Sequence, residues 1–337
     1  MRVGTPRWWY VRKGAPAPVI RALLRPISWA WAGVTARKIA RATPVDPGIP
    51  VICVGNLTMG GTGKTPVVRE LIARLQARGV DAHGLSRGYG GRLAGPLKVD
   101  PAAHTATDVG DEPLMLAQRQ PIWISRDRPA GAATAAKAGA QVLVMDDGHQ
   151  NPSLKKTLSF VVVDGETRNG EWPFGDGAVF PSGPLREPFK AGLARADAVV
   201  LMLPTDVARA DPELVDLFAD KPVLIARLEP LGPPPTEPQL GFAGVGKPWK
   251  VQSSLKAAGA NLIDFASFPD HAGYSEDTLK ALQAQALAHG AGLLTTEKDW
   301  IRLPPAWRAK VTPWPVRARF EDEAALDALL VRAISRG

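Results

Sequence analysis

A glycine-rich segment between residues 55 and 65 has the composition needed to hold a nucleotide phosphate. It reads GNLTMGGTGKT, follows the apolar run 51–54 and precedes apolar residues at helical spacing. Glycines let backbone N–H groups turn toward phosphate oxygens, and the next helix adds a partial positive charge. The lysine of such a loop reaches the β and γ phosphates, and the hydroxyl after it ligates Mg²⁺. We therefore predict a nucleoside triphosphate loop with a catalytic Lys64 and a Mg²⁺ ligand in Thr65, made by Thr58, Met59, Gly60, Gly61, Thr62, Gly63, Lys64 and Thr65.

Thr58 departs from the usual pattern of this loop. The pattern G-x-x-x-x-G-K-[ST] places a glycine five residues before the second glycine, here Gly63, and this chain has Thr58 at that position. An ordinary glycine-rich turn between a strand and a helix is the alternative interpretation. The strand and helix patterns on either side favour the phosphate-binding loop.

Two adjacent acids end another apolar run, QVLVM at 141–145. In phosphate-loop proteins a strand beside the loop strand ends in a carboxylate that binds Mg²⁺ directly or through water. Asp146 is the first choice for this ligand, and Asp147 follows it. A strand that ends in Asp-Asp-Gly is by itself more often a turn, but the phosphate loop upstream favours the metal site.

Asp111 and Glu112 precede an apolar helical stretch at 114–116. Acids in the first turn of a helix often only cap its free N–H groups. A kinase, however, requires a carboxylate that accepts the proton of the attacking hydroxyl. His271, which follows Asp270 in a loop, is a second candidate because a histidine beside such a carboxylate can tune or relay the proton, although a loop histidine is usually only solvated.

Arg87 and Arg186 lie in loops shaped by glycine or proline, SRGYGG at 86–91 and PSGPLREP at 181–188. Either arginine could clamp a phosphate, and either could be an ordinary surface residue. Both are therefore candidates for phosphate or substrate contacts, together with Glu112.

The elements that must position these residues alternate between strand and helix. Apolar runs near 51–54, 80–85, 122–125, 141–145, 160–163 and 198–203 are separated by helical patterns, which is typical of a parallel sheet covered by helices. A chain of 337 residues exceeds the size of most single cores. We predict a P-loop kinase domain over 46–229, a proline-rich linker over 230–239 and a second, smaller α/β domain over 240–337 that closes over the active site.

The first 45 residues form a separate region. Nine of the 41 basic residues and none of the acids lie in 1–41, so that the net charge of +8 belongs to this end, and 32 basic residues face 33 acids elsewhere. Apolar residues recur at helical spacing from Val19 to Trp31, with Arg21 and Arg25 on the other side. Such an amphipathic helix binds an anionic membrane interface without spanning it. A secretory signal and a helix packed on the protein's own core are the alternatives.

Composition limits the remaining choices. Cys53 is the only cysteine, so the chain has no internal disulfide and no cysteine-based zinc site. The body of the chain is neutral, which argues against a nucleic acid partner.

Seven segments, taken in order, resemble the tetraacyldisaccharide 4′-kinases, the lipid A 4′-kinases of Gram-negative bacteria. They run from about Val51 to Asp299, and Thr58 fits this family. His149 departs from the phenylalanine usual after Asp-Asp-Gly, which affects local packing and leaves the metal acids intact. The segments are GNLTMGGTGKTP at 55–66, SRGYGG at 86–91, VGDEP at 109–113, MDDGHQ at 145–150, PSGPLREP at 181–188, FPDHAGYS at 268–275 and TTEKD at 295–299.

The resemblance implies a two-domain α/β enzyme at the cytoplasmic face of the bacterial inner membrane. It would transfer the γ-phosphate of ATP to the 4′-hydroxyl of an acylated glucosamine disaccharide lipid, the tetraacyldisaccharide 1-phosphate, to give lipid IVA. By the family pattern, Asp111 paired with His271 is the base, and Asp146 and Asp147 serve Mg²⁺ and the phosphates. The alternative is a membrane-associated regulatory or partitioning ATPase without a lipid substrate, which leaves Asp270 and His271 unexplained.

Overall fold

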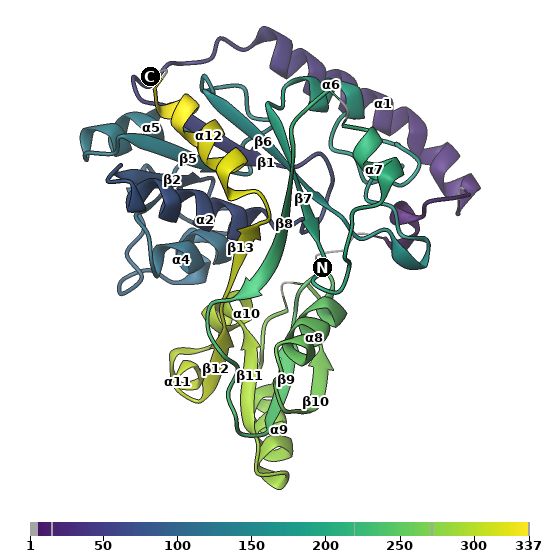
Figure 1. The fold of residues 1–337 in the computed structure, drawn as a ribbon, viewed down its shortest axis with the longest axis vertical. Coiled ribbons are helices and arrows are strands. Elements are labelled where there is room, and N and C mark those ends of the chain that lie inside the picture. The colour runs from purple at the N-terminus through teal and green to yellow at the C-terminus, as the bar shows by residue number, and fades with distance from the viewer. Residues whose placement is uncertain (1–5, 15, 219, 271, 336–337) are drawn as a thin grey trace.

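The computed structural model describes residues 6–14, 16–218, 220–270 and 272–335. Within these ranges the chain builds two β-sheets with helices packed on them (Figure 1). The larger sheet fills the upper part of the view, and the smaller one projects below it. The α/β class with a P-loop-type parallel sheet, predicted from the alternation of patterns, is confirmed.

The described part of the larger sheet has nine strands in the order β13-β8-β7-β6-β1-β5-β2-β4-β3. Every neighbouring pair is parallel except the two edge pairs, β13 with β8 and β3 with β4. Central strands read as continuous apolar runs because helices cover both faces of a parallel sheet. The strands are β1 (Val51–Gly55), β2 (Ala82–Ser86), β3 (Leu97–Lys98), β4 (Ile122–Ile124), β5 (Val142–Asp146), β6 (Leu158–Asp164), β7 (Ala198–Leu203), β8 (Val223–Pro230) and β13 (Val316–Phe320).

Helices pack on both faces of this sheet, and the side chains of β1 show it. Ile52 and Val54 enter one core with α2 and α12, whereas Val51 and Cys53 enter another with α5. The helices of this part are α2 (Lys64–Ala77), α3 (Ala106–Val109), α4 (Asp111–Ala117), α5 (Arg128–Lys137), α6 (Phe189–Ala194), α7 (Pro212–Asp216) and α12 (Glu323–Ile334), with the short 3-10 turns η1 (Arg7–Tyr10) and η2 (Arg168–Gly170).

The smaller sheet has the order β10-β9-β11-β12 among the described residues, and its pairs are all parallel. Its own core forms around Leu240, Phe242 and Leu279. The elements are β9 (Gln239–Ala243), α8 (Pro248–Ala257), β10 (Leu262–Ser267), α9 (Glu276–Ala288), β11 (Gly292–Thr296), α10 (Glu297–Arg302), α11 (Pro305–Arg308) and β12 (Val311–Trp314).

The C-terminal segment departs from the division predicted at residue 240. After β12 the chain returns to the larger sheet, where β13 pairs with β8 and α12 buries Leu326, Leu330 and Ala333 in the core shared with α2. Strand β13 pairs with the backbone groups that β8 would otherwise leave free at the sheet edge, and α12 buries its apolar face in the core. Residues 316–334 therefore belong with the phosphate-loop sheet, and not with the second unit as predicted.

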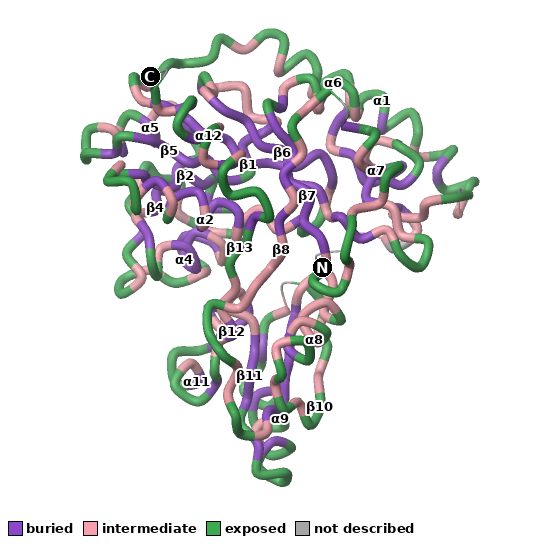
Figure 2. The backbone as a smooth tube through the Cα atoms, in the orientation of Figure 1, coloured by how far each residue is buried: buried purple, intermediate pink, exposed green. Residues whose placement is uncertain are grey.

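Helix α1 (Pro18–Arg41) lies along the outside of the larger part (Figure 1), where it contacts the 176–186 loop. Its apolar side chains face outward, and Leu23 is 72% exposed. Figure 2 shows that most of the helix is exposed. Arg21, predicted to point toward lipid headgroups, is instead buried in an ion pair with Asp176. Within the described ranges no helix has the length and apolarity needed to cross a bilayer.

Candidate active site

The phosphate loop connects β1 to α2 in the predicted position. Gly60 and Gly63 have φ angles of +92° and +86°, a region that side chains with a Cβ rarely enter. Gly63 is the N-cap of α2, and no side chain caps this helix start. The Thr62 hydroxyl is buried and has no hydrogen-bond partner among the described residues. The first turn of α2 and this hydroxyl can therefore bind an anion.

Residues from a distant loop hold the phosphate loop in shape. Met59 N–H donates to the Pro184 carbonyl at 2.7 Å, and Thr58 forms a β-bridge with Leu185. Arg186 Nε donates to the Thr58 carbonyl at 3.0 Å. Thr58, which departs from the general loop pattern, therefore has its backbone paired with the segment that contains Leu185 and Arg186.

Lys64, Arg186 and Asp147 come together at the start of α2. Asp147 Oδ1 lies 3.6 Å from Lys64 Nζ and 2.7 Å from an Arg186 guanidinium nitrogen. Burial raises the pKa of Asp147, but the two cations outweigh it and hold the pKa at about 2. Asp147 is therefore ionised at neutral pH. Of the two arginines predicted as candidate contacts, Arg186 lies in this cluster, whereas Arg87 is exposed after β2.

Asp146 ends β5, directly beside Val54 of the loop strand. Its side chain is buried, and Oδ1 has no hydrogen-bond partner among the described residues. Burial, together with the charges of Glu112 and Asp147, raises the pKa of Asp146 to about 7 against the opposing effect of Lys64. A buried carboxylate oxygen without a partner suits a cation, and Mg²⁺ bound with a nucleotide needs only one or two protein carboxylates. Among the described residues, no group of three or more His, Cys, Asp or Glu side chains is arranged to hold a metal ion.

Arg128, which the sequence gave no reason to select, is buried close to these acids. Burial lowers its pKa to about 10, while the charge of Asp146 opposes this shift and that of Arg87 adds to it. One guanidinium nitrogen donates to the Ser125 carbonyl at 2.5 Å, and Nε has no partner among the described residues. The sequence feature that could have pointed to Arg128 is its position in the first turn of α5, shortly after the end of β4.

Asp111 and Glu112 begin α4, as the capping interpretation also required. They face helix α10 of the second unit. Asp111 Oδ2 lies 3.7 Å from Arg302 Nε, and Glu112 Oε1 lies 3.5 Å from Lys298 Nζ. The charge of Glu112 acts on Asp146, which places the start of α4 near the predicted metal ligand. The predicted partner of Asp111, His271, lies outside the described residues.

The TTEKD segment at 295–299 forms a buried polar centre in the second sheet. Asp299 is fully buried and accepts hydrogen bonds from the Gly244 N–H, the Tyr274 hydroxyl and the Arg302 guanidinium. Arg302, one helical turn after Asp299, is thereby directed at Asp111. This arginine was missed by sequence reasoning, although its i, i+3 spacing from Asp299 was visible.

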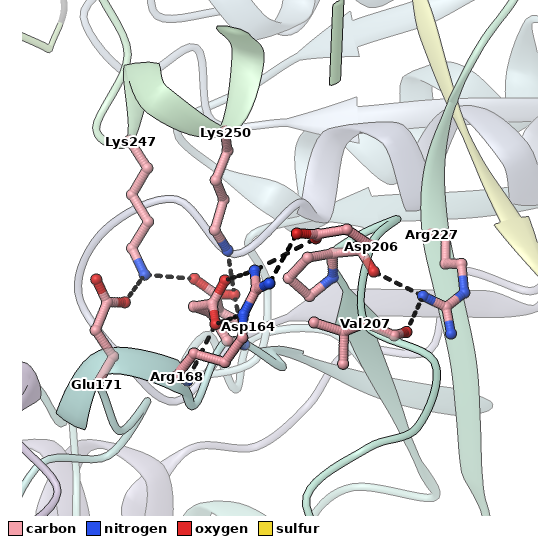
Figure 3. A network of polar contacts seen from close by, with 10 residues as sticks. Asp164, Arg168, Glu171, Asp206, Val207, Arg227, Lys247 and Lys250 are labelled. Atoms are coloured by element: carbon pink, nitrogen blue, oxygen red, sulfur yellow. Dashed lines mark hydrogen bonds and ion pairs between the residues drawn. The ribbon is translucent and has the colours of Figure 1, made fainter. Parts of the chain in front are cut away.

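A second group of ion pairs joins the two parts of the molecule at the end of β6 (Figure 3). Lys247 binds Asp164 at 2.9 Å and Glu171 at 2.5 Å, and Lys250 binds Asp164 at 2.7 Å. Burial raises the pKa of Asp164, but the two lysines outweigh it and the net shift is downward. Lys247, which follows the glycine-containing turn after β9, therefore contacts two acids of the larger part.

Three comparisons relate the chain to known proteins. The family model described as "Tetraacyldisaccharide-1-P 4'-kinase" matches residues 20–335. Proteins named "Tetraacyldisaccharide 4'-kinase" from Caulobacter vibrioides and Phenylobacterium zucineum are each 68% identical over 330 residues, which covers 98% of this chain and 98% and 99% of theirs. A crystal structure of "apo" form LpxK from Aquifex aeolicus in complex with ATP is 27% identical, with a TM-score of 0.72 over 94% of this chain and 99% of that chain.

Proposed function

Because this chain belongs to the tetraacyldisaccharide 4′-kinase family, we propose that it transfers the ATP γ-phosphate to the 4′-hydroxyl of a tetraacylated glucosamine disaccharide 1-phosphate, giving lipid IVA in lipid A biosynthesis. The observation that carries this proposal is the ion pair of Lys64 with Asp147 beside the buried Asp146, on which the charge of Glu112 at the start of α4 also acts. The alternative of a regulatory or partitioning ATPase is not favoured by the family match.

Different side chains neutralise charge, accept the proton and position the base. Lys64 and Arg186 neutralise charge on the triphosphate, which is the main task in phosphoryl transfer. Asp111 accepts the proton of the 4′-hydroxyl as its oxygen bonds to the γ-phosphorus, and the bond from phosphorus to the β,γ-bridging oxygen breaks to release ADP. Arg302 holds the Asp111 carboxylate in position. His271 is the proposed partner of Asp111.

Mg²⁺ is the proposed cofactor. Asp146, Asp147 and Thr65 would hold it, and the orphan oxygen of Asp146 supports this assignment. The ion would supply further neutralisation of the phosphate charge.

The acylated substrate resides in a bilayer, so the enzyme must work at the membrane surface. The outward apolar face of α1 supports peripheral binding to an anionic membrane, with Arg25, Arg37, Lys38 and Arg41 available to headgroups. We assign the protein on this basis to the cytoplasmic face of the inner membrane, where ATP is available.

Incubation of the purified protein with Mg²⁺, γ-labelled ATP and the disaccharide 1-phosphate lipid tests the proposal. Label should appear in a bisphosphorylated lipid. Label released only to water would favour the switch ATPase.

Asp111→Asn should lower the rate of lipid phosphorylation by about 10²- to 10⁴-fold, because the substitution removes the general base and preserves side-chain shape. ATP affinity, measured by calorimetry, should stay within about twofold. Asp216→Asn, an exposed position on α7, is the matched control and should retain full activity. Equal loss of ATP binding and transfer in Asp111→Asn would assign Asp111 to nucleotide binding or structure.

A further inference from the structure

The N-terminal segment before α1 is fastened to the loop that shapes the nucleotide site. Backbone hydrogen bonds join Arg12 N–H to the Gly170 carbonyl and Trp172 N–H to the Tyr10 carbonyl, at 2.8 and 2.6 Å. Trp9 is buried, and its ring packs edge-on against Phe180. Residues 6–12 thus lie on the 170–186 loop, the same loop whose end contacts the phosphate loop.

Tyr10 reaches the phosphate loop directly. Its hydroxyl donates to the Met59 carbonyl at 2.6 Å, while the Met59 N–H donates to the Pro184 carbonyl at 2.7 Å. Both polar backbone groups of Met59 are therefore fixed, one by the N-terminal segment and one by the 170–186 loop. The next residue, Gly60, has a φ angle of +92°, so the anchor sits where the loop begins its turn.

Helix α1 contacts the same loop with its polar side. Trp31 Nε1 donates to the Arg186 carbonyl at 3.0 Å, and Ser28 exchanges hydrogen bonds with Ser182 at 2.7 and 3.0 Å. The Trp31 ring also packs on Phe180, 5.0 Å between centroids, so Trp9 and Trp31 share this ring. The guanidinium of Arg186 binds Asp147 and the Thr58 carbonyl, whereas its backbone is held by α1.

We propose that the N-terminal segment and α1 form part of the nucleotide site, with Tyr10 and Trp31 as positioning residues for the phosphate loop and for Arg186. This inference rests on the membrane docking of the proposed function. A bilayer that seats the apolar face of α1 restrains the segment that carries both hydrogen bonds. The glycine-rich loop then loses less conformational freedom when ATP binds. Membrane binding and ATP binding therefore reinforce each other, by the same factor in both directions.

Tyr10→Phe and Trp31→Phe test the two positioning bonds. Each removes one hydrogen-bond donor and keeps an aromatic ring. In the full chain without vesicles, the dissociation constant for ATP, measured by calorimetry, should rise about two- to tenfold in each variant. In the kinase assay KM for ATP should rise while kcat changes little, whereas a merely structural defect would lower the active fraction and leave KM unchanged. Trp29→Phe, an exposed position on the same helix, is the matched control and should bind ATP normally.

Vesicles of phosphatidylcholine with phosphatidylglycerol, without any lipid acceptor, test the coupling. They should lower the dissociation constant for ATP in the unmodified protein, and ATP should tighten vesicle binding by the same factor. Tyr10→Phe should bind empty vesicles normally and show a reduced effect of vesicles on ATP binding. Normal ATP affinity in both variants, or no effect of vesicles on ATP binding by the unmodified protein, would overturn the proposal. Failure of the kinase proposal would show separately, as absence of label in the lipid.

Discussion

At the scale of single residues, two adjacent carboxylates have opposite electrostatic surroundings. Asp147 is held ionised by its ion pairs with Lys64 and Arg186, and its φ angle is +51°. Asp146 is buried at the end of β5 with acids as neighbours, so that its pKa is raised. The first remains ionised beside cationic side chains, and the second suits a site that a cation completes.

Arg186→Lys should raise KM for ATP about tenfold, although the charge is conserved. The guanidinium bonds to Thr58 and Asp147 with different nitrogen atoms, and an ammonium cannot reproduce both bonds. Initial-rate kinetics at varied ATP concentration measure the effect. Arg319→Lys on the edge strand β13 is the control, since Arg319 is exposed and its partner Glu229 is only half-buried. An unchanged KM in Arg186→Lys would show that the guanidinium geometry is dispensable.

At the scale of elements, α1 shows how a helix can present its apolar residues outward. Its inward side uses Arg21 and Ser28, which pair with Asp176 and Ser182, and its outward side carries Val19, Leu23 and Ile27. Contiguous exposed apolar side chains mark an interaction surface. We propose that this surface meets the membrane.

Leu23→Ser combined with Ile27→Ser should weaken binding to anionic vesicles at least about tenfold, because each apolar side chain contributes more than about 1 kcal/mol on transfer from water. The fold should be unaffected, since both side chains are exposed. Vesicle sedimentation measures the binding. Leu287→Ser, exposed on α9, serves as the control. Undiminished binding would place the membrane surface elsewhere on the protein.

A buried histidine on β2, which contacts a tryptophan of β4, is expected to make the stability of the fold depend on pH. His83 is buried, its Nε2 contacts Asp81, and Trp123 Nε1 donates to His83 Nδ1 at 3.1 Å. Burial lowers the pKa of His83 below its ordinary 6.5, while Asp81 partly opposes this effect. The unfolded chain therefore takes up a proton first, and stability must fall as the pH drops through 6.5.

His83→Asn should reduce this dependence, because the amide is uncharged at all pH values and its oxygen can still accept from Trp123. The pH dependence is measured as the difference between the free energies of unfolding at about pH 7.5 and about pH 5.5, one unit on each side of the usual pKa. The difference should be larger in the unmodified protein than in the variant. His289→Asn, exposed at the end of α9, should behave like the unmodified protein. Equal differences in all three proteins would exclude the role of His83.

At the scale of the whole molecule, the second unit contacts the first through two separate groups of ion pairs. In one group α10 brings Arg302 to Asp111, and Glu297 to Arg69 of α2 at 2.6 Å. In the other group Lys247 and Lys250 bind Asp164 at the end of β6 (Figure 3). The carboxyl ends of parallel strands are where such folds bind ligands. Both contacts therefore bear on how the second unit lies against this end of the larger sheet.

Lys247→Met combined with Lys250→Met should loosen this arrangement, because Asp164 would remain buried without either cation. Hydrogen exchange of residues 165–171 and of α8 should accelerate at least about tenfold, a loss of about 1.4 kcal/mol. The core of the second sheet at α9 should exchange as before. Lys256→Met, exposed on α8, is the matched control. Unchanged exchange in the double variant would mean that these ion pairs do not hold the two parts together.

The sequence by itself determined the parts whose signal is local. Consecutive glycines before Gly-Lys-Thr predict a phosphate loop, and apolar runs such as 141–145 and 198–203 predict buried parallel strands, because spacing and backbone preference act within a few residues. The ordered segments from 55 to 299 indicated the family. The boundaries of the central strands lay within a few residues of those predicted.

Only the tertiary structure decided what depends on long-range contacts. It placed β13 and α12 on the first sheet, turned Arg21 inward, and brought Arg302 to Asp111 and Tyr10 to Met59. Each of these partners is separated by tens to hundreds of residues, so no local pattern encodes the pairing. Which side of α1 faces the protein depends on where Asp176 and Ser182 lie in the folded loop, and an amphipathic pattern alone is compatible with either orientation.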